Sequence, residues 1–219
     1  MVALAVPASA ATFTVNTTND GSGVCTTDPA TNGVCTLRAA IQAAVTLGVS
    51  NTIVVPAGTY ILSQAGACPF LGRLTTTLCP TGDMTIIGAG AEQTVIDGNG
   101  QGQVFVVTGA GTSVALNGIT IRNGHSSVLA FGGGIYNSAV LSLTDAVILG
   151  NAANTGGGIY NDQGTLTLIN CTVLGNSSID EGAGMVNDRG TVLFTNGTMS
   201  RGNGGQLGCT ITSASGFSA

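Results

Sequence analysis

Four acidic residues near the C-terminal end are the side chains best placed to bind a metal. Asp162 and Asp188 each follow an asparagine at the end of similar segments, and Asp180 and Glu181 precede the second segment. If these segments stack as neighbouring strands, Asp162 and Asp188 lie about 5 Å apart. Carboxylates this close repel one another unless a cation neutralises them, and Ca²⁺ takes about six to eight oxygen ligands. The sequence therefore predicts a calcium site formed by Asp162, Asp180, Glu181 and Asp188.

A second interpretation of the same cluster needs no metal. Arg189 directly follows Asp188, so its guanidinium can neutralise part of the charge while water screens the rest. The chain also lacks the Asp-x-Asp-x-Asp-Gly spacing of a calcium-binding loop. Both interpretations stay open on the sequence alone, and no cofactor other than this calcium ion is predicted.

Acid–base catalysis finds less support. A polysaccharide lyase needs aspartates that hold calcium and a base beside the uronate, and a glycoside hydrolase needs two carboxylates around one groove. Asp97 lies in an Asp-Gly turn and Asp145 replaces an asparagine of the repeats, so both are expected to be structural. The single histidine, His125, is expected in a solvated loop. The arginines of the repeats fall in different columns: Arg122, Arg189 and Arg201. The sequence predicts no catalytic residue and leaves catalysis open, with a non-catalytic protein favoured.

Two pairs of cysteines bracket short loops that have no apolar core of their own. Each pair is expected to form a disulfide that staples its loop, Cys25 with Cys35 and Cys68 with Cys79. Cys171 is expected to be a buried free thiol. Cys209 is assigned to the column of Asn137, which argues against a bond between Cys171 and Cys209.

Internal repeats indicate the fold that must position these side chains. The hexapeptide Gly-Gly-Gly-Ile-Tyr-Asn occurs at 132–137 and 156–161, and weaker copies begin at Gly182 and Gly204. Apolar residues alternate over short runs between Gly and Asn, the pattern of strands joined by tight turns. Self-similarity at a period of about 20–30 residues is typical of a solenoid, in which each coil buries its apolar face against its neighbours.

Stacked coils place equivalent residues in columns. The column of large inward residues is expected to be Ile135, Ile159, Met185 and Leu207. Two columns hold side chains that tolerate left-handed geometry and bond from coil to coil: Asn117, Asp145, Asn170 and Asn196, and then Asn137, Asn161 and Asn187. The column of small inward residues is expected to be Gly118, Ala146, Cys171 and Gly197. Tyr136 and Tyr160 are expected to point outward, either exposed to a sugar or stacked on each other.

A single amphipathic helix precedes the repeats. Its apolar stripe follows helical spacing at Leu37, Ala40, Ile41, Ala44 and Val45. Thr36 is placed to cap its start and Gly48 to end it, while Arg38 and Gln42 are expected to face away from the core. A solenoid end exposes unpaired edge groups and an open core, so this helix is expected to cover the first coil.

The composition limits which kinds of partner the protein can bind and which cellular compartment it can occupy. The 219 residues include 35 glycines, only 7% are charged, and the net charge is −5 with a pI of about 4.3. This balance argues against nucleic-acid binding, because no basic patch is available to release counterions. No run of about 18 apolar residues occurs, so no transmembrane helix is predicted. Residues 1–11 end in Ala8-Ser9-Ala10 and are interpreted as the remnant of a secretory signal peptide.

Several segments carry a family resemblance. Cys35–Ile41, preceded by Thr12–Asp20, resembles the CSLREA domain of bacterial secreted β-helix proteins, with Thr36 for Ser and Ala39 for Glu. Ile53–Leu62 is similar to the first coil of pectin-lyase-like right-handed β-helices, and the Gly-Gly-Gly-Ile repeats resemble polymorphic outer-membrane proteins. The resemblance implies an all-β, single-stranded right-handed parallel β-helix of about seven coils. Its parts would be a cap at 12–50 and coils at 51–219 that continue beyond a truncated C-terminus.

The expected function is that of a non-catalytic extracellular or cell-surface module, of the adhesin, passenger or stalk type. Its expected location is secreted, on the bacterial cell surface or in the outer membrane, and its partner would be a surface glycan or protein. End-to-end association or continuation at the C-terminal edge is also expected. The alternatives are a polysaccharide lyase or glycoside hydrolase, and an ice- or surface-binding protein. The ice-binding alternative is discounted because these threonines do not share one column: Thr120, Thr144, Thr167, Thr172 and Thr198.

Overall fold

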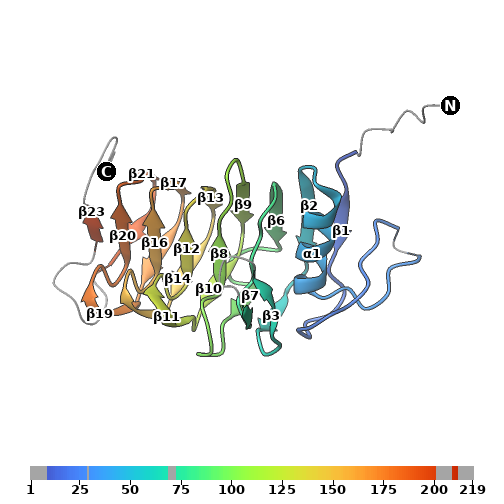
Figure 1. Cartoon of the computed structure of the whole chain (residues 1–219), viewed down its shortest axis with the longest axis horizontal. Coiled ribbons are helices and arrows are strands. Elements are labelled where there is room, and N and C mark those ends of the chain that lie inside the picture. The colour runs from blue at the N-terminus through green and yellow to red at the C-terminus, as the bar shows by residue number, and fades with distance from the viewer. Residues whose placement is uncertain (1–8, 29, 69–72, 201–208, 212–219) are drawn as a thin grey trace.

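The computed structural model describes residues 9–28, 30–68, 73–200 and 209–211. Strands stack side by side along one long axis, with the helix at the N-terminal end and the last described strand at the other (Figure 1). The predicted signal remnant (1–11) thus lies largely outside the described residues, as do Arg201, Gly204 and Leu207 of the predicted columns.

Four parallel sheets form the walls of the solenoid. Sheet 1 has seven strands in the order β1 (Thr12–Thr14), β2 (Asn51–Val55), β6 (Met84–Gly88), β9 (Ser113–Asn117), β13 (Val140–Thr144), β17 (Thr165–Ile169) and β21 (Thr191–Thr195). Sheet 2 has six, β3 (Gly58–Ile61), β7 (Thr94–Asp97), β10 (Thr120–Arg122), β14 (Val147–Leu149), β18 (Thr172–Leu174) and β22 (Thr198–Met199). Sheet 3 has β11 (His125–Phe131), β15 (Ala152–Thr155) and β19 (Ser177–Glu181). Sheet 4 has β8 (Phe105–Val107), β12 (Ile135–Asn137), β16 (Ile159–Asp162), β20 (Met185–Asp188) and β23 (Cys209–Ile211).

The chain is therefore a parallel β-helix, as predicted, but with fewer complete turns than expected. Three coils pass through all four sheets, β9 to β12, β13 to β16 and β17 to β20, and β6, β7 and β8 make most of a fourth. The prediction of about seven coils was therefore too high, because the strands of the first and last parts of the chain do not complete a turn through all four sheets. One hairpin, β4 (Gly66–Cys68) with β5 (Arg73–Thr75), is antiparallel and lies outside the four sheets.

The column of large inward residues is confirmed over three coils. Ile135 pairs with Ile159 and Ile159 with Met185, and all three side chains are fully buried. The fourth member was wrong, because Met185 pairs with Cys209 rather than with Leu207. Cys209 therefore does not align with Asn137, and Ile211 stands in that register instead. The predicted register of the last coil was based on the glycines at 204–205. The correct register follows instead from the spacing of Met185 and Cys209, which equals that of Ile135 and Ile159.

One predicted turn column was displaced by a single residue. The left-handed positions are Gly118, Asp145, Asn170 and Asn196, with φ between 51° and 62°. Gly118 takes the place predicted for Asn117, because glycine reaches this geometry without strain. Ile119 then occupies the inward position beside Ala146 and Cys171, so that column is not uniformly small.

Buried asparagines bind successive coils together at two corners. The predicted ladder is present: Asn137 Nδ2 donates to Asn161 Oδ1 at 2.7 Å, and Asn161 Nδ2 donates to Asn187 Oδ1 at 2.6 Å. A second ladder was not predicted, in which Asn151 donates to Asn176 Oδ1 at 3.0 Å. These amides are at most 1% exposed, so each bond replaces hydration that burial has removed.

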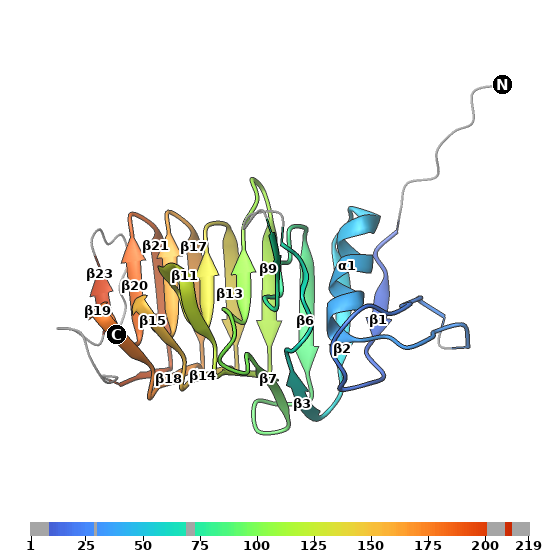
Figure 2. The same cartoon turned by 60° about the horizontal axis from the view of Figure 1, so that its bottom comes forward.

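Helix α1 (Leu37–Leu47) lies across the first coil beside β1 and β2 (Figure 2). The predicted caps are confirmed: the Thr36 hydroxyl accepts from the Ala39 amide at 3.0 Å, and Gly48 ends the helix in left-handed geometry. Arg38, however, does not face away from the core, because it is only 4% exposed.

Arg38 is buried because it holds the cap together. Its Nε and Nη2 donate to the two carboxylate oxygens of Asp20 at 2.8 and 3.0 Å, and it also donates to the carbonyls of Thr76 and Thr77. The same carboxylate accepts the amides of Ser63 and Gln64. Burial alone would raise the pKa of Asp20, but the bonds from Arg38 and these amides outweigh it and lower the pKa below 3.8.

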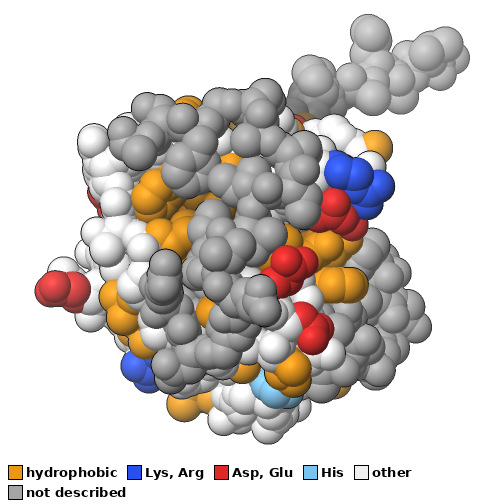
Figure 3. All heavy atoms as spheres, turned by 90° about the vertical axis from the view of Figure 1, so that its left-hand side faces the viewer, with side chains coloured by type: hydrophobic (Ala, Val, Ile, Leu, Met, Phe, Trp, Pro, Cys, Tyr) orange, Lys and Arg blue, Asp and Glu red, His pale blue; other side chains and the backbone are white. Residues whose placement is uncertain are grey.

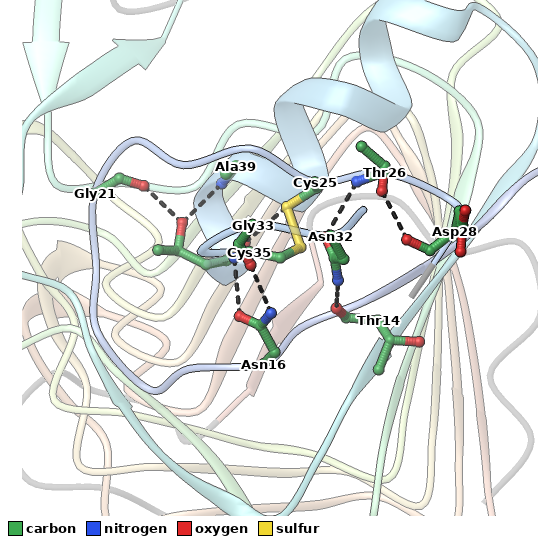
Figure 4. The surroundings of a disulfide bond; sticks show 11 residues. Thr14, Asn16, Gly21, Cys25, Thr26, Asp28, Asn32, Gly33, Cys35 and Ala39 are labelled. Carbon is green, nitrogen blue, oxygen red and sulfur yellow. Dashed lines mark hydrogen bonds between the residues drawn. A yellow bond between two sulfur atoms is a disulfide. The ribbon is translucent and has the colours of Figure 1, made fainter. Parts of the chain in front are cut away.

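Both predicted disulfides are confirmed, Cys25–Cys35 and Cys68–Cys79. Around the first, Asn16 accepts from the Cys35 amide and donates to the Gly33 carbonyl, so side-chain bonds order the loop beside the bridge (Figure 4). Cys171 is a buried free thiol, as expected, and burial raises its pKa.

We expect Asp20→Ala to lower the free energy of unfolding by about 3–5 kcal/mol, because it leaves the buried Arg38 cation without its counterion. Glu92→Ala, which removes an exposed carboxylate, is the matched control and should change little. The folded-state pKa of Asp20 lies below its ordinary value of 3.8. Its contribution to the free energy of unfolding is therefore complete above that pH and is lost as the pH falls further. Urea unfolding at pH 7 and pH 3 measures both effects. Equal losses for the two variants would contradict the assigned role.

Candidate functional site

The four carboxylates predicted to bind calcium do not form one site. Asp162 and Asp188 are register partners on β16 and β20, as expected. Asp180 and Glu181 lie on β19, in a different sheet, and both are exposed. Within the part of the chain that the structure describes, no group of three or more His, Cys, Asp or Glu side chains is arranged to hold a metal ion.

Asp162 and Asp188 instead bond to tyrosines and an arginine. The Tyr136 hydroxyl donates to Asp162 Oδ2 at 2.6 Å, and the Tyr160 hydroxyl donates to Asp188 Oδ2 at 3.3 Å. Arg189 lies 3.0 Å from Asp188 Oδ1 and 3.8 Å from Asp162 Oδ1, as the metal-free interpretation predicts. Burial and the nearby Asp188 and Asp162 carboxylates raise the pKa of Tyr160 to about 12, so its hydroxyl remains a donor at neutral pH.

The two tyrosines form a wall rather than an exposed platform. Their ring planes are 7° apart with centroids 6.0 Å from each other, and the residues are only 6% and 8% exposed. Of the two interpretations of this pair, mutual stacking is therefore confirmed and exposure to a sugar is wrong. Tyr136 also packs in a cluster with Val106 and Cys68, beside the hairpin disulfide.

An open pocket of about 430 Å³ lies on another side of the solenoid, where sheet 2 turns into sheet 3. Its lining comes from several coils: Ile61, Asp97, Asn99, Gly100, Asn123, Gly124, His125, Gly150 and Ala152. Figure 3 looks along the solenoid from the β23 end and shows the chain's one histidine at the lower margin, open to solvent. This pocket gathers polar side chains from several coils and is the candidate functional site.

Asp97 is the fixed centre of the pocket. Its Oδ1 accepts the Asn99 amide at 2.9 Å, which confirms the predicted turn bond. Its Oδ2 accepts Arg122 Nε at 2.8 Å and Asn123 Nδ2 at 2.9 Å. Asp97 and Arg122 are register partners on β7 and β10, so one column pairs a carboxylate with an arginine.

The residues around Asp97 combine hydrogen-bonding groups with apolar surface. Asn99 and Asn123 both adopt left-handed backbone geometry, with φ of 55° and 53°, and both are exposed. His125 begins a strand rather than lying within a loop, and its amide donates to the Gly102 carbonyl at 2.9 Å. Ile61, the register partner of Asp97 on β3, is 49% exposed.

Small residues line part of the pocket. His125 pairs with Ala152, and the neighbouring corner positions are Gly124 and Gly150. A β-carbon at Gly124 would collide with the carbonyl of Gly133 in the adjoining wall, so only glycine fits there. Asp97 is far from Arg122 and His125 in the sequence, and the register between β7 and β10 is the signal that would have placed Asp97 beside Arg122.

Comparisons with known proteins leave the chain without an assigned family. No family model matches the sequence, and no curated protein matches it. Among solved structures, ORF18 of Geobacillus virus E2 is similar over 78% of this chain and 38% of its own, with 16% sequence identity and a TM-score of 0.47. The chain thus spans well under two thirds of that protein, and a similarity of this size has no bearing on function.

We expect calcium to leave the stability of the protein unchanged, because Arg189 and two tyrosine hydroxyls already engage the carboxylates of Asp162 and Asp188. Melting curves in millimolar calcium and in chelator should coincide, while Asp188→Asn should lower the melting temperature equally in both. A rise in melting temperature with calcium that Asp188→Asn abolishes would show instead that the carboxylates bind the ion.

Proposed function

We propose that this protein is a non-catalytic extracellular recognition module that binds a neutral glycan in the pocket around Asp97. The observation that carries the proposal is the convergence of Asp97, Asn99, Asn123 and His125 on one open hollow. The adhesin, passenger or stalk role expected from the sequence is retained, and the pocket supplies its point of contact.

The chemistry of the pocket suits a sugar ring. Sugar hydroxyls both donate and accept, and the amides of Asn99 and Asn123 offer both capacities at exposed positions. The side chain of Ile61 supplies apolar surface for the C–H face of a ring. Because Arg122 balances the charge of Asp97, the pair favours an uncharged ligand over a strongly anionic one.

The proposed location rests on the disulfides and on the resemblance. Two disulfides are typical of proteins that fold in an oxidising compartment. The helix of the described region is too short to cross a membrane. Secretion to a bacterial cell surface or outer membrane, a CSLREA-type cap and right-handed pectin-lyase-like winding all belong to the proposal.

A second candidate function is a polysaccharide lyase or glycoside hydrolase. It is favoured by one observation, that a carboxylate, an arginine and an imidazole gather at the same corner of the coils. The two candidates differ in whether the bound glycan is cleaved, so turnover separates them.

We expect the protein to bind immobilised neutral glycans, tested with dextran, mannan and galactan. We expect His125→Ala to weaken this binding about tenfold, because the variant loses one hydrogen bond to the sugar. Asn154→Ala, which removes another exposed polar side chain of sheet 3, should leave affinity unchanged. Surface plasmon resonance measures both variants. Equal affinities for wild type and His125→Ala would exclude this pocket as the binding site.

We also expect no sustained release of unsaturated or reducing product from polygalacturonate, alginate or the neutral glycans. The physical reason is that Asp97 already accepts three hydrogen bonds and is held by Arg122, which suits positioning better than proton transfer. Turnover that is abolished by Asp97→Asn would establish the enzymatic alternative in place of the proposed binding role.

A further inference from the structure

The outer face of sheet 1 is a second surface, distinct from the pocket. Along each of its strands, side chains alternate between the core and solvent. Inward residues such as Ile53, Ile86 and Leu116 are fully buried, whereas the alternate residues are all half-buried or exposed. Figure 2 shows this run of neighbouring strands from β6 through β21 along the long axis.

The printed register places the outward side chains in straight ranks that cross the coils. The first rank consists of Thr12, Thr52, Thr85, Ala115, Ser142, Thr167 and Leu193. The second consists of Thr14, Val54, Ile87, Asn117, Thr144, Ile169 and Thr195. A shorter third rank consists of Ser113, Val140, Thr165 and Thr191.

These ranks differ from the column that the sequence analysis examined. Thr120, Thr172 and Thr198 lie in sheet 2, while Thr144 and Thr167 stand in separate ranks of sheet 1. Those five threonines thus do not share one column, as expected, and the ranks of sheet 1 are a different set of residues.

The three ranks are uncharged and periodic in two directions, and the carboxylate of Asp83, which accepts the Ser113 amide at 2.8 Å, flanks the third rank. All outward residues in the three ranks are neutral, and most carry a hydroxyl, often beside a methyl group. Neighbouring members of a rank are about 4.8 Å apart and neighbouring ranks about 6.6 Å apart, from the spacing of strands and the rise per residue. Charged side chains would order water around themselves, whereas neutral hydroxyl and methyl groups impose only the spacing of the sheet on the water that they contact.

We propose that the outer face of sheet 1 binds the surface of ice crystals. The strand repeat is close to the shortest lattice repeat of hexagonal ice. In the first rank, the consecutive hydroxyls of Thr12, Thr52 and Thr85, and those of Ser142 and Thr167, can therefore bond successive lattice oxygens while methyl groups fill the gaps between them. The seven strands of sheet 1 give this face a length that a small ligand would not need but that an extended crystal surface can contact. The proposal is independent of the glycan pocket, since none of the pocket residues lies in sheet 1.

The test is inhibition of ice recrystallisation together with partition of the protein into slowly growing ice. Thr167→Lys places a charge in the centre of the first rank and should abolish both effects. Thr172→Lys is the matched control, because it adds the same charge to a half-buried threonine of sheet 2 in the same coil, and it should retain both. Thr85→Lys repeats the test on another coil should Thr167→Lys fail to fold, with circular dichroism as the check.

Three results would overturn the proposal: a wild-type protein with no effect on ice, equal loss in the Thr167→Lys and Thr172→Lys proteins, or full activity in the Thr167→Lys protein. Sedimentation of the same variants tests whether a second copy of the chain, instead of ice, occupies this face. A dimer that Thr167→Lys disperses and Thr172→Lys does not would show that a second copy of the chain occupies the face, which also overturns ice binding.

Discussion

Each coil of this protein relies on the next coil to complete the hydrogen bonds of its buried polar groups. The Asn137, Asn161 and Asn187 amides are essentially inaccessible to water, and each finds its partner in the adjoining coil. An amide left alone in such a place costs about 1–3 kcal/mol, so every coil must repeat the geometry of its neighbour. The straight ranks of side chains on the outer walls follow from this constraint.

The same constraint makes the first coil special, because its outer edge has no neighbour of the repeating type. Helix α1 and the loop before it cover this edge, and the buried pair of Asp20 and Arg38 fastens them to the turn at Ser63 and to the carbonyls of Thr76 and Thr77. The segments Thr12–Asp20 and Cys35–Ile41 supply one partner each, and neither contributes a side chain to the pocket.

Sequence reasoning predicted what depends on local spacing. The strands, the caps at Thr36 and Gly48 and both disulfides follow from neighbouring residues, and the structure bears them out. It failed where a single residue decides the register, as at Gly118, or where a distant partner decides burial, as for Arg38 with Asp20. The pocket was missed for the same reason. Its polar residues come from coils about 25 residues apart, and only the pairing of β7 with β10 brings Asp97 to Arg122.

The central claim is that the corner around Asp97 holds a neutral sugar, and the single histidine of the chain makes it directly measurable. Its imidazole gives one isolated set of nuclear magnetic resonance signals, which can be followed while dextran, mannan or galactan oligosaccharides are added. The account predicts that the signals of His125 and of the Asn123 side-chain amide shift together and saturate, while those of Asn154 stay in place. Saturable binding that leaves His125 and Asn123 unshifted, or no shift with any of these glycans, would contradict it.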